Sequence, residues 1–254
     1  MADEPSAKRP RGETSNQSSE VDDIQVPAQK HDYKRYLKEV VIHAKEKPNV
    51  VCTSNPDEAG KMNSRIMKRV CGLYPQHIGV DVEYIREDEP PQRAAVLQLC
   101  MEELCLVYHI STATKWPSLR LFLKEDMFYT FAGFSIEGDK EMLQRSGLEI
   151  NPDKYIDIQR KWSVPFKERK RFHSLADVAG SVIHPFYNKM KKKIDRDEDH
   201  KLWGINPLPD YLIEYAVIDA YATYESWKRI ENIREGLESA KEAEKNYEDP
   251  YYGY

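Results

Sequence analysis

The segment Ile78–Tyr84 constrains the fold more than any other part of this 254-residue chain. It is apolar and rich in β-branched residues, so it predicts a strand in the centre of a sheet. Two acids, Asp81 and Glu83, stand two residues apart within it. Because successive side chains of a strand point to opposite faces, both carboxylates lie on one face. Two unpaired acids are unusual in a central strand, since a buried charge needs a partner or a metal ion.

The rest of the chain predicts a mixed α/β sheet covered by helices, because strands come first and helices dominate late. The three strands between residues 78 and 110 are expected to form an antiparallel meander. Apolar patterns predict further strands over 50–52, 94–101, 104–110, 129–136 and 155–158, and helices over 57–70, 118–124, 139–146, 174–183 and 210–245.

We expect three regions along the chain. Residues 1–32 are polar and charged with few large apolar residues, which predicts a disordered tail. Within it, Lys8-Arg9-Pro10-Arg11 is either a short nuclear-import signal or a solvated charge cluster. Residues 33–235 form the folded domain, and residues 236–254 form a charged, aromatic tail.

Composition narrows the class of protein. A mean hydropathy of -0.73, no apolar run of about 20 residues and no apolar signal core predict a soluble, unsecreted protein of the nucleus or cytoplasm without membrane contact. The four cysteines form no CxxC pair, so we expect reduced thiols and no zinc site. Because the net charge is -5, any binding of nucleic acid must depend on a limited part of the surface rather than on the overall charge. The basic runs 167–171 and 189–193 are either a phosphate-tracking rim or solvated loops.

Two later segments carry further candidate site residues. Tyr215 and Asp219 stand four residues apart in a predicted helix, which places them on one face, one turn apart. Asp139 follows a predicted strand and opens a predicted helix. Each feature alone has a simpler interpretation: solvated acids on a half-exposed strand, a core tyrosine with an acid at the rim, and a helix cap.

Together these residues are more specific than any one of them. The four carboxylates of Asp81, Glu83, Asp139 and Asp219 formally balance two Mg²⁺ ions, and an all-oxygen set suits hard cations. Two such ions can stabilise the attacking and leaving oxygens of a phosphoryl displacement. Tyr215 would then orient the attacking water, since a free phenol titrates near ~10 and is a poor base.

The motifs that hold these residues resemble the DEDDy family of 3′–5′ exonucleases within the RNase D-like superfamily. The likeness is strongest to the exonuclease domain of Werner syndrome helicase and its free-standing plant relatives. It covers roughly residues 45 to 230, and Ser174–Ala179 and Trp203 also fall where the family has a helix and an aromatic residue. Three motifs in the family's order carry it: Ile78–Tyr84 with Ala95–Cys100, Ala132–Asp139 with Leu143, and Tyr215–Tyr221.

The resemblance implies a ribonuclease H-like mixed five-stranded sheet flanked by helices. It implies hydrolysis of phosphodiester bonds from a 3′ end, release of nucleoside 5′-monophosphates and two Mg²⁺ or Mn²⁺ ions. Asp81, Glu83, Asp139 and Asp219 would be the metal ligands, and Tyr215 would position the water. The expected partners are DNA or RNA with a free 3′ end and a helicase or repair protein in trans. An oligomer is compatible with this, because some relatives form rings.

Two alternatives remain open at this point. The loop Arg86-Glu87-Asp88-Glu89 is acidic where relatives often carry basic or neutral residues, which would suit a weakly active or inactive nucleic-acid-binding or scaffold paralogue. The same two-metal chemistry also serves endonucleases on ribonuclease H-like folds. Sequence does not discriminate DNA from RNA, because contacts to the 2′-hydroxyl leave no signature here.

Overall fold

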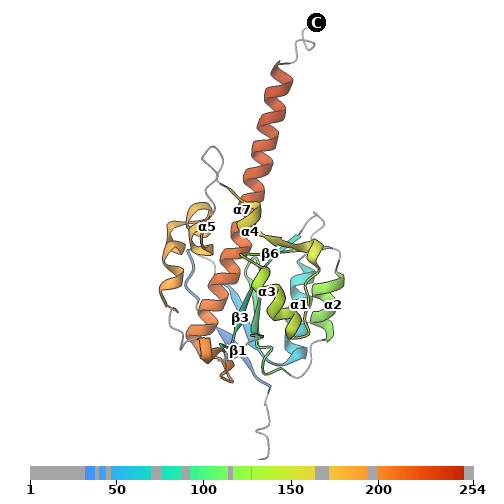
Figure 1. The fold of residues 1–254 in the computed structure, drawn as a ribbon, viewed down its shortest axis with the longest axis vertical. Coiled ribbons are helices and arrows are strands. Elements are labelled where there is room, and N and C mark those ends of the chain that lie inside the picture. Colours follow the sequence, from blue (N-terminus) through green and yellow to red (C-terminus); the bar gives the residue numbers. More distant parts are fainter. Residues whose placement is uncertain are drawn as a thin grey trace, which may run out of the picture.

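The computed structural model describes residues 32–37, 40–43, 47–69, 76–86, 92–113, 117–126, 128–163, 172–193 and 200–248. Its centre is one seven-stranded sheet with the strand order β1-β2-β5-β4-β3-β6-β7. Figure 1 shows this sheet between two groups of helices. The strands are β1 (Lys34–Leu37), β2 (Asn49–Thr53), β3 (Gln76–Tyr84), β4 (Ala94–Met101), β5 (Leu104–Tyr108), β6 (Tyr129–Gly133) and β7 (Tyr155–Asp157).

The sheet is mixed, and its antiparallel centre is the predicted meander. β3 pairs with β4 and β4 pairs with β5, both antiparallel, whereas β2 joins β5 and β6 joins β3 in parallel. All eight residues of β4 and all five of β5 are buried. Strands that are apolar on both faces need cover on both sides, and the helices supply it.

The helices lie on both faces of the sheet. α7 packs along β3, β4 and β5, and α5 packs on α7. α1, α2 and α3 lie on the opposite side (Figure 1). The α-helices are α1 (Pro56–Lys68), α2 (Pro117–Glu125), α3 (Glu137–Arg145), α4 (Ile158–Lys161), α5 (Leu175–Val182) and α7 (Asp210–Glu248), and the 3₁₀ helices are η1 (Pro152–Lys154), η2 (Pro185–Lys193) and η3 (Leu202–Gly204).

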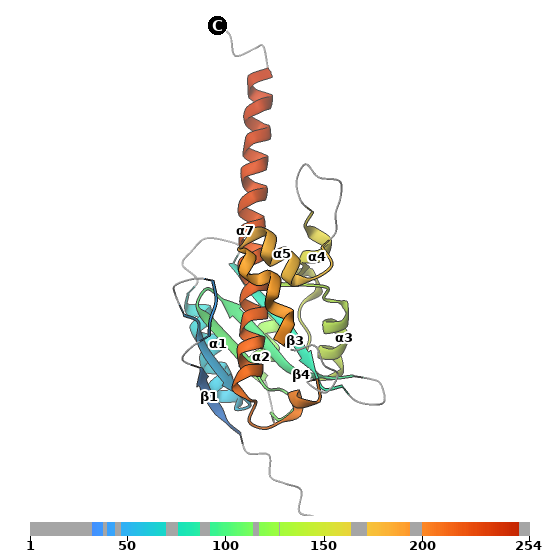
Figure 2. The same cartoon turned by 90° about the vertical axis from the view of Figure 1, so that its left-hand side faces the viewer.

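The 39-residue α7 has two different parts. Its first half is buried on the sheet, with Leu212, Ala216 and Ala220 almost fully covered. Its second half extends beyond the domain, as Figures 1 and 2 show. The half on the sheet carries Tyr215 and Asp219, so the packing of α7 on β3 decides where these two residues lie.

Gly79 on β3 allows this close packing. A Cβ at this position would lie 2.4 Å from the carbonyl oxygen of Ala220 and 2.5 Å from the backbone nitrogen of Tyr224, both on α7. No other residue type fits without moving the helix backbone, which matches the use of strand glycines where another backbone approaches closely. Gly79 also shows that odd-numbered residues of β3 face α7.

We predict that Gly79→Ala lowers the free energy of unfolding by about 1–3 kcal/mol, because the added methyl group forces α7 away from β3. Urea denaturation of both proteins measures the change. Gly236→Ala is the matched control, because Gly236 lies in α7 with nothing within 4 Å of the added Cβ. The control should be neutral or stabilising, since alanine favours helix interiors. Equal loss in both variants would contradict the packing role of Gly79.

The structure confirms the predicted class and corrects several details. The sheet has seven strands instead of the five that the resemblance implies: β1 at one edge is not predicted from the sequence, and β7 at the other edge is the short strand predicted over 155–158. β6 ends at Gly133, three residues before the predicted end at Ile136, and α3 begins at Glu137. Asp139 is therefore the third residue of α3 and not its cap. Within the predicted C-terminal tail, residues 236–248 continue α7.

Some expectations concern other parts of the chain. The following lie outside the residues that the structure describes: residues 1–31 with the basic cluster at 8–11, the acidic positions 87–89, Cys71, the run 167–171 and residues 249–254. Among the described cysteines, Cys52, Cys100 and Cys105 are free and buried. In the part of the chain that the structure covers, none of the helices has the length and hydropathy needed to cross a membrane.

Candidate active site

β3 presents Asp81 and Glu83 toward α7. Both have the same parity along the strand as Gly79, which touches the helix. They pair in register with Gln98 and Val96 of the antiparallel neighbour β4, so they sit inside the sheet and away from its edges. Glu83 is 8 % exposed and Asp81 is half-buried. The strand thus places two carboxylates side by side under the helix, as the two-residue spacing predicts.

α7 brings Asp219 to these two acids. Oxygen atoms of Asp81, Glu83 and Asp219 all lie within 4.8 Å of one another. Tyr215 lies one turn earlier on α7, and its hydroxyl hydrogen-bonds to Asp219. All four residues line a pocket of about 310 Å³, whose other walls include Phe134, Gln159, His173 and Leu175. Residues more than 130 positions apart in the sequence therefore converge on one cavity.

This concentration of acids is electrostatically costly. Burial raises the pKa of Asp81 well above its usual value, and the neighbouring Glu83, Asp219 and Asp139 raise it further. Like charges a few ångströms apart disfavour each other's ionised form. A bound cation removes that cost, because it supplies the positive charge that the cluster lacks.

The same surroundings keep Tyr215 protonated. Burial raises the pKa of the Tyr215 phenol above its ordinary value, and the charges of Asp219, Glu83 and Asp81 add to the effect. The neutral hydroxyl can donate one hydrogen bond and accept others. Trp203 is fully buried beside it, with ring centroids 6.3 Å apart, and helps to hold the Tyr215 ring in place.

Asp139 lies next to the group of three carboxylates and does not belong to it. Burial raises the pKa of Asp139 to about 7, while the Tyr155 hydroxyl favours its charged form and Asp157 opposes it. The Tyr155 hydroxyl is buried without a hydrogen bond of good geometry, so it contacts Asp139 loosely. Asp139 is still close enough to Asp81 to raise the pKa of that residue.

Sequence reasoning missed several residues around the site. Tyr155 in β7 and His173 before α5 give no signal of their own, because a tyrosine in a strand and a histidine in a loop are common. Asp157 fixes the turn that leads to Asp139: its Oδ1 accepts hydrogen bonds from the backbone N–H of Ser135 (3.1 Å) and of Gln159 (2.9 Å). Ser135 adopts a positive φ of 58°, which is uncommon for a residue other than glycine.

The donor set fits a hard divalent cation. Its ligand atoms are carboxylate oxygens, the atoms that Mg²⁺ and Mn²⁺ prefer, and the group of three contains neither histidine nor cysteine. The raised pKa of Asp81 fits as well, since an acid that is unstable as an anion gains most from a metal partner. Asp81, Glu83 and Asp219 are thus placed to hold a metal ion.

A family model described as 3′–5′ exonuclease matches residues 56–235, the range that holds all five predicted site residues. The mouse bifunctional 3′–5′ exonuclease/ATP-dependent helicase WRN is 26 % identical over 159 residues, which are 61 % of this chain and 11 % of that protein. A 3′–5′ exonuclease of Drosophila willistoni is 27 % identical over 160 residues, 60 % of this chain and 42 % of that protein. The chain thus spans less than half the length of either relative.

The fold has a counterpart among solved structures. RNase D of Escherichia coli, an exoribonuclease involved in structured RNA processing, superposes with a TM-score of 0.53 at 19 % identity. The match covers 74 % of this chain and 46 % of that one. At this identity the likeness concerns the fold alone. The family model covers most of the chain and includes the three carboxylates and the tyrosine that meet in one pocket, so the chain belongs to the 3′–5′ exonuclease family.

Proposed function

We propose that this chain is a metal-dependent 3′–5′ exonuclease that hydrolyses nucleic-acid phosphodiester bonds from the 3′ end and releases nucleoside 5′-monophosphates. The observation that supports it most is the meeting of Asp81, Glu83 and Asp219 within 4.8 Å in a pocket that also contains Tyr215. The pocket has a volume of about 310 Å³, which suits a strand end better than the middle of a duplex.

In this proposal Asp81, Glu83 and Asp219 hold two divalent cations, and Asp139 completes the set. When bound, such ions stabilise negative charge on the attacking and leaving oxygens and lower the pKa of a coordinated water. Asp139 keeps its place beside Asp81 through the turn that Asp157 fixes. Four carboxylates balance two such ions, so substrate phosphate meets little net repulsion.

Tyr215 orients the attacking water in this scheme. Its phenol is protonated, and its hydroxyl lies against Asp219, one turn further along α7. A neutral hydroxyl can fix the water by hydrogen bonding and leaves the proton to another acceptor. Trp203 limits the motion of the ring, so the hydroxyl is placed before substrate arrives.

The products and the direction of attack test the proposal. Single-stranded DNA and RNA of one sequence, labelled at the 5′ end, are incubated with the purified chain in Mg²⁺, Mn²⁺ or EDTA. We expect labelled strands that shorten stepwise from the 3′ end, nucleoside 5′-monophosphates as product, and no degradation in EDTA. A closed circular strand should stay intact.

Other outcomes point to the other interpretations. Cutting of the closed circle would indicate an endonuclease, because that substrate has no end. Binding of the strands without degradation in either metal would indicate a nucleic-acid-binding protein that retains the fold without the activity. Release of nucleoside 3′-monophosphates would contradict the proposed attack.

A further inference from the structure

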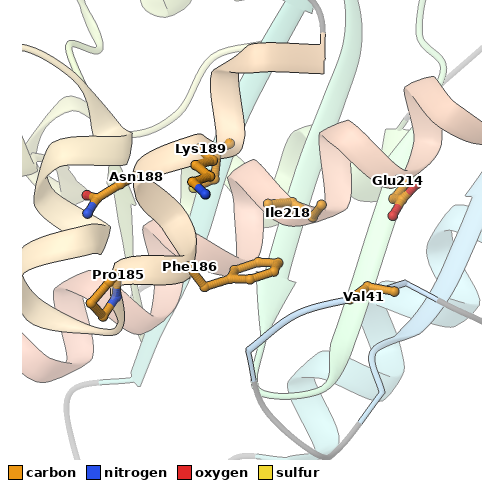
Figure 3. Close-up of a pocket in the computed structure, with 8 residues that line it drawn as sticks. Val41, Pro185, Phe186, Asn188, Lys189, Glu214 and Ile218 are labelled. Carbon is orange, nitrogen blue, oxygen red and sulfur yellow. The ribbon is translucent and has the colours of Figure 1, made fainter.

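A second and larger pocket lies between η2, α7 and the chain that follows β1. Its volume is about 770 Å³, within the ~300–1,000 Å³ typical of ligand sites. Its walls include Val41, Phe186, Lys189, Glu214 and Ile218. Figure 3 shows the Phe186 ring reaching from η2 toward the α7 side of the pocket, with Lys189 above it and Val41 to its right. No residue of the candidate active site lines it.

This pocket is a direct neighbour of the candidate active site. On α7, Glu214 and Ile218 line the large pocket, and the next residues, Tyr215 and Asp219, line the small one. Leu175 of α5 lines the small pocket and packs in one apolar cluster with Ile218 and Met190, which line the large one. The two cavities thus share a wall made of α7 and this cluster.

The lining combines an aromatic face with a cation. Phe186 is 39 % exposed, much for a phenylalanine that stands in a cavity wall. Lys189 is exposed and forms no ion pair with any residue that the structure describes. Proteins that bind single-stranded nucleic acid use this combination: bases stack on aromatic rings and phosphates lie along cations. Glu214 lines the α7 side of the pocket, and its negative charge would repel a phosphate group from α7 toward Lys189.

η2 is fixed before any ligand binds. A Cβ at Gly180 of α5 would lie 1.7 Å from Oδ1 of the Asn188 side chain, so Gly180 leaves room for Asn188 where η2 packs on α5. Directly after Phe186, the hydroxyl of the buried Tyr187 hydrogen-bonds to Nδ1 of His43 at 2.7 Å. Because η2 is already packed through these neighbours of Phe186, stacking of a base on the ring orders little additional chain.

We propose that this pocket binds a nucleobase of the single-stranded substrate, upstream of the 3′-terminal nucleotide, with the base on Phe186 and its phosphate at Lys189. The small pocket is large enough for little more than the terminal nucleotide, so the rest of the strand must cross neighbouring surface. The identity of the strand rests on the proposed exonuclease function. The apolar, aromatic lining and Lys189 support a base-binding site independently of it.

Binding without turnover tests the pocket. Fluorescence anisotropy in EDTA measures the Kd of a labelled single-stranded decamer, as DNA and as RNA, for the wild type, Phe186→Ala and Lys189→Gln. Phe186→Ala should weaken binding about 10-fold, from the loss of one stacked base. Lys189→Gln should lower the salt dependence of log K by about 0.7, the value of one phosphate contact on a single strand. Phe128→Ala removes an exposed phenylalanine outside the pocket and should bind like the wild type.

Turnover provides the second measurement. In Mg²⁺ or Mn²⁺, the ratio of kcat/KM for the decamer to kcat/KM for the p-nitrophenyl ester of thymidine 5′-monophosphate should fall about 10-fold in Phe186→Ala, because this ester has no upstream base to occupy the second pocket. Circular dichroism and Tm confirm that each variant is folded. An unchanged Kd and an unchanged ratio in Phe186→Ala would overturn the inference. Phe186-dependent binding by a protein that degrades no strand would support the pocket and contradict the exonuclease function.

Discussion

Replacing Asp81 with asparagine is expected to lower kcat/KM on a single-stranded substrate by about 10³-fold or more. Asp81 stands in the group of three carboxylates and its charge is coupled to Glu83 and Asp219, so its loss removes one ligand and one negative charge. Metal ions contribute several kcal/mol to stabilising a phosphoryl transition state, and about 4 kcal/mol corresponds to 10³-fold in rate. Asparagine keeps the shape, so the rate change reports on the charge.

The same substitution should stabilise the metal-free protein. Burial and neighbouring acids raise the pKa of Asp81 in the folded state above its unfolded-state value, so ionising it costs folding free energy. That cost is absent below the unfolded-state pKa of ~3.9 and grows as pH rises through the folded-state pKa. In EDTA, the Tm of Asp81→Asn should exceed that of the wild type at neutral pH, and the difference should shrink toward acid.

The opposed effects on activity and stability make the result specific. Asp153→Asn serves as control, because Asp153 is an exposed acid in η1, away from the pocket lining. It should change neither the rate nor the Tm in EDTA. An active Asp81→Asn variant would show that the metal ions lie elsewhere. A variant that is inactive but less stable than the wild type in EDTA would indicate that Asp81 has a structural role.

Local periodicity predicts which side chains of the candidate site share a face. Asp81 and Glu83 share a face because strand side chains alternate, and Tyr215 and Asp219 share one because a helix repeats every 3.6 residues. The pair on β3 and the pair on α7 meet only because α7 approaches β3 closely. This approach needs Gly79 beneath the backbone of Ala220. A lone glycine in a strand predicts some close contact but does not name the partner.

The position of Asp139 shows where local reasoning fails. The turn before α3 depends on a hydrogen bond from Ser135 to Asp157, 22 residues away, and on a left-handed Ser135. No short-range pattern encodes either, so the sequence predicts a helix that begins two residues late, at Asp139, and leaves a helix cap as the simpler interpretation of this residue. β1 was missed for a related reason, since its four residues are too few to show a period. It is recognisable only through its pairing with β2.

Replacing Tyr215 with phenylalanine is expected to lower kcat about 10²-fold while KM changes little. The substitution removes only the hydroxyl that hydrogen-bonds to Asp219 and keeps the ring against Trp203. Positioned groups that act on a proton or a water in the transition state typically contribute 10²–10⁴-fold, and orientation without proton abstraction belongs at the lower end. Single-turnover kinetics on a labelled strand measure the chemical step directly.

Two further measurements separate orientation of water from support of the metal ligands. Tyr211→Phe is the matched control, because Tyr211 lies one turn earlier on α7 and is 45 % exposed; its kcat should equal that of the wild type. If Tyr215 orients water, Mn²⁺ should raise the Tm of Tyr215→Phe as much as that of the wild type, since the carboxylates are intact. A lost Tm response would mean that the hydroxyl acts by holding Asp219 in place. Wild-type kcat in Tyr215→Phe would remove Tyr215 from the mechanism and leave catalysis to the carboxylate ligands.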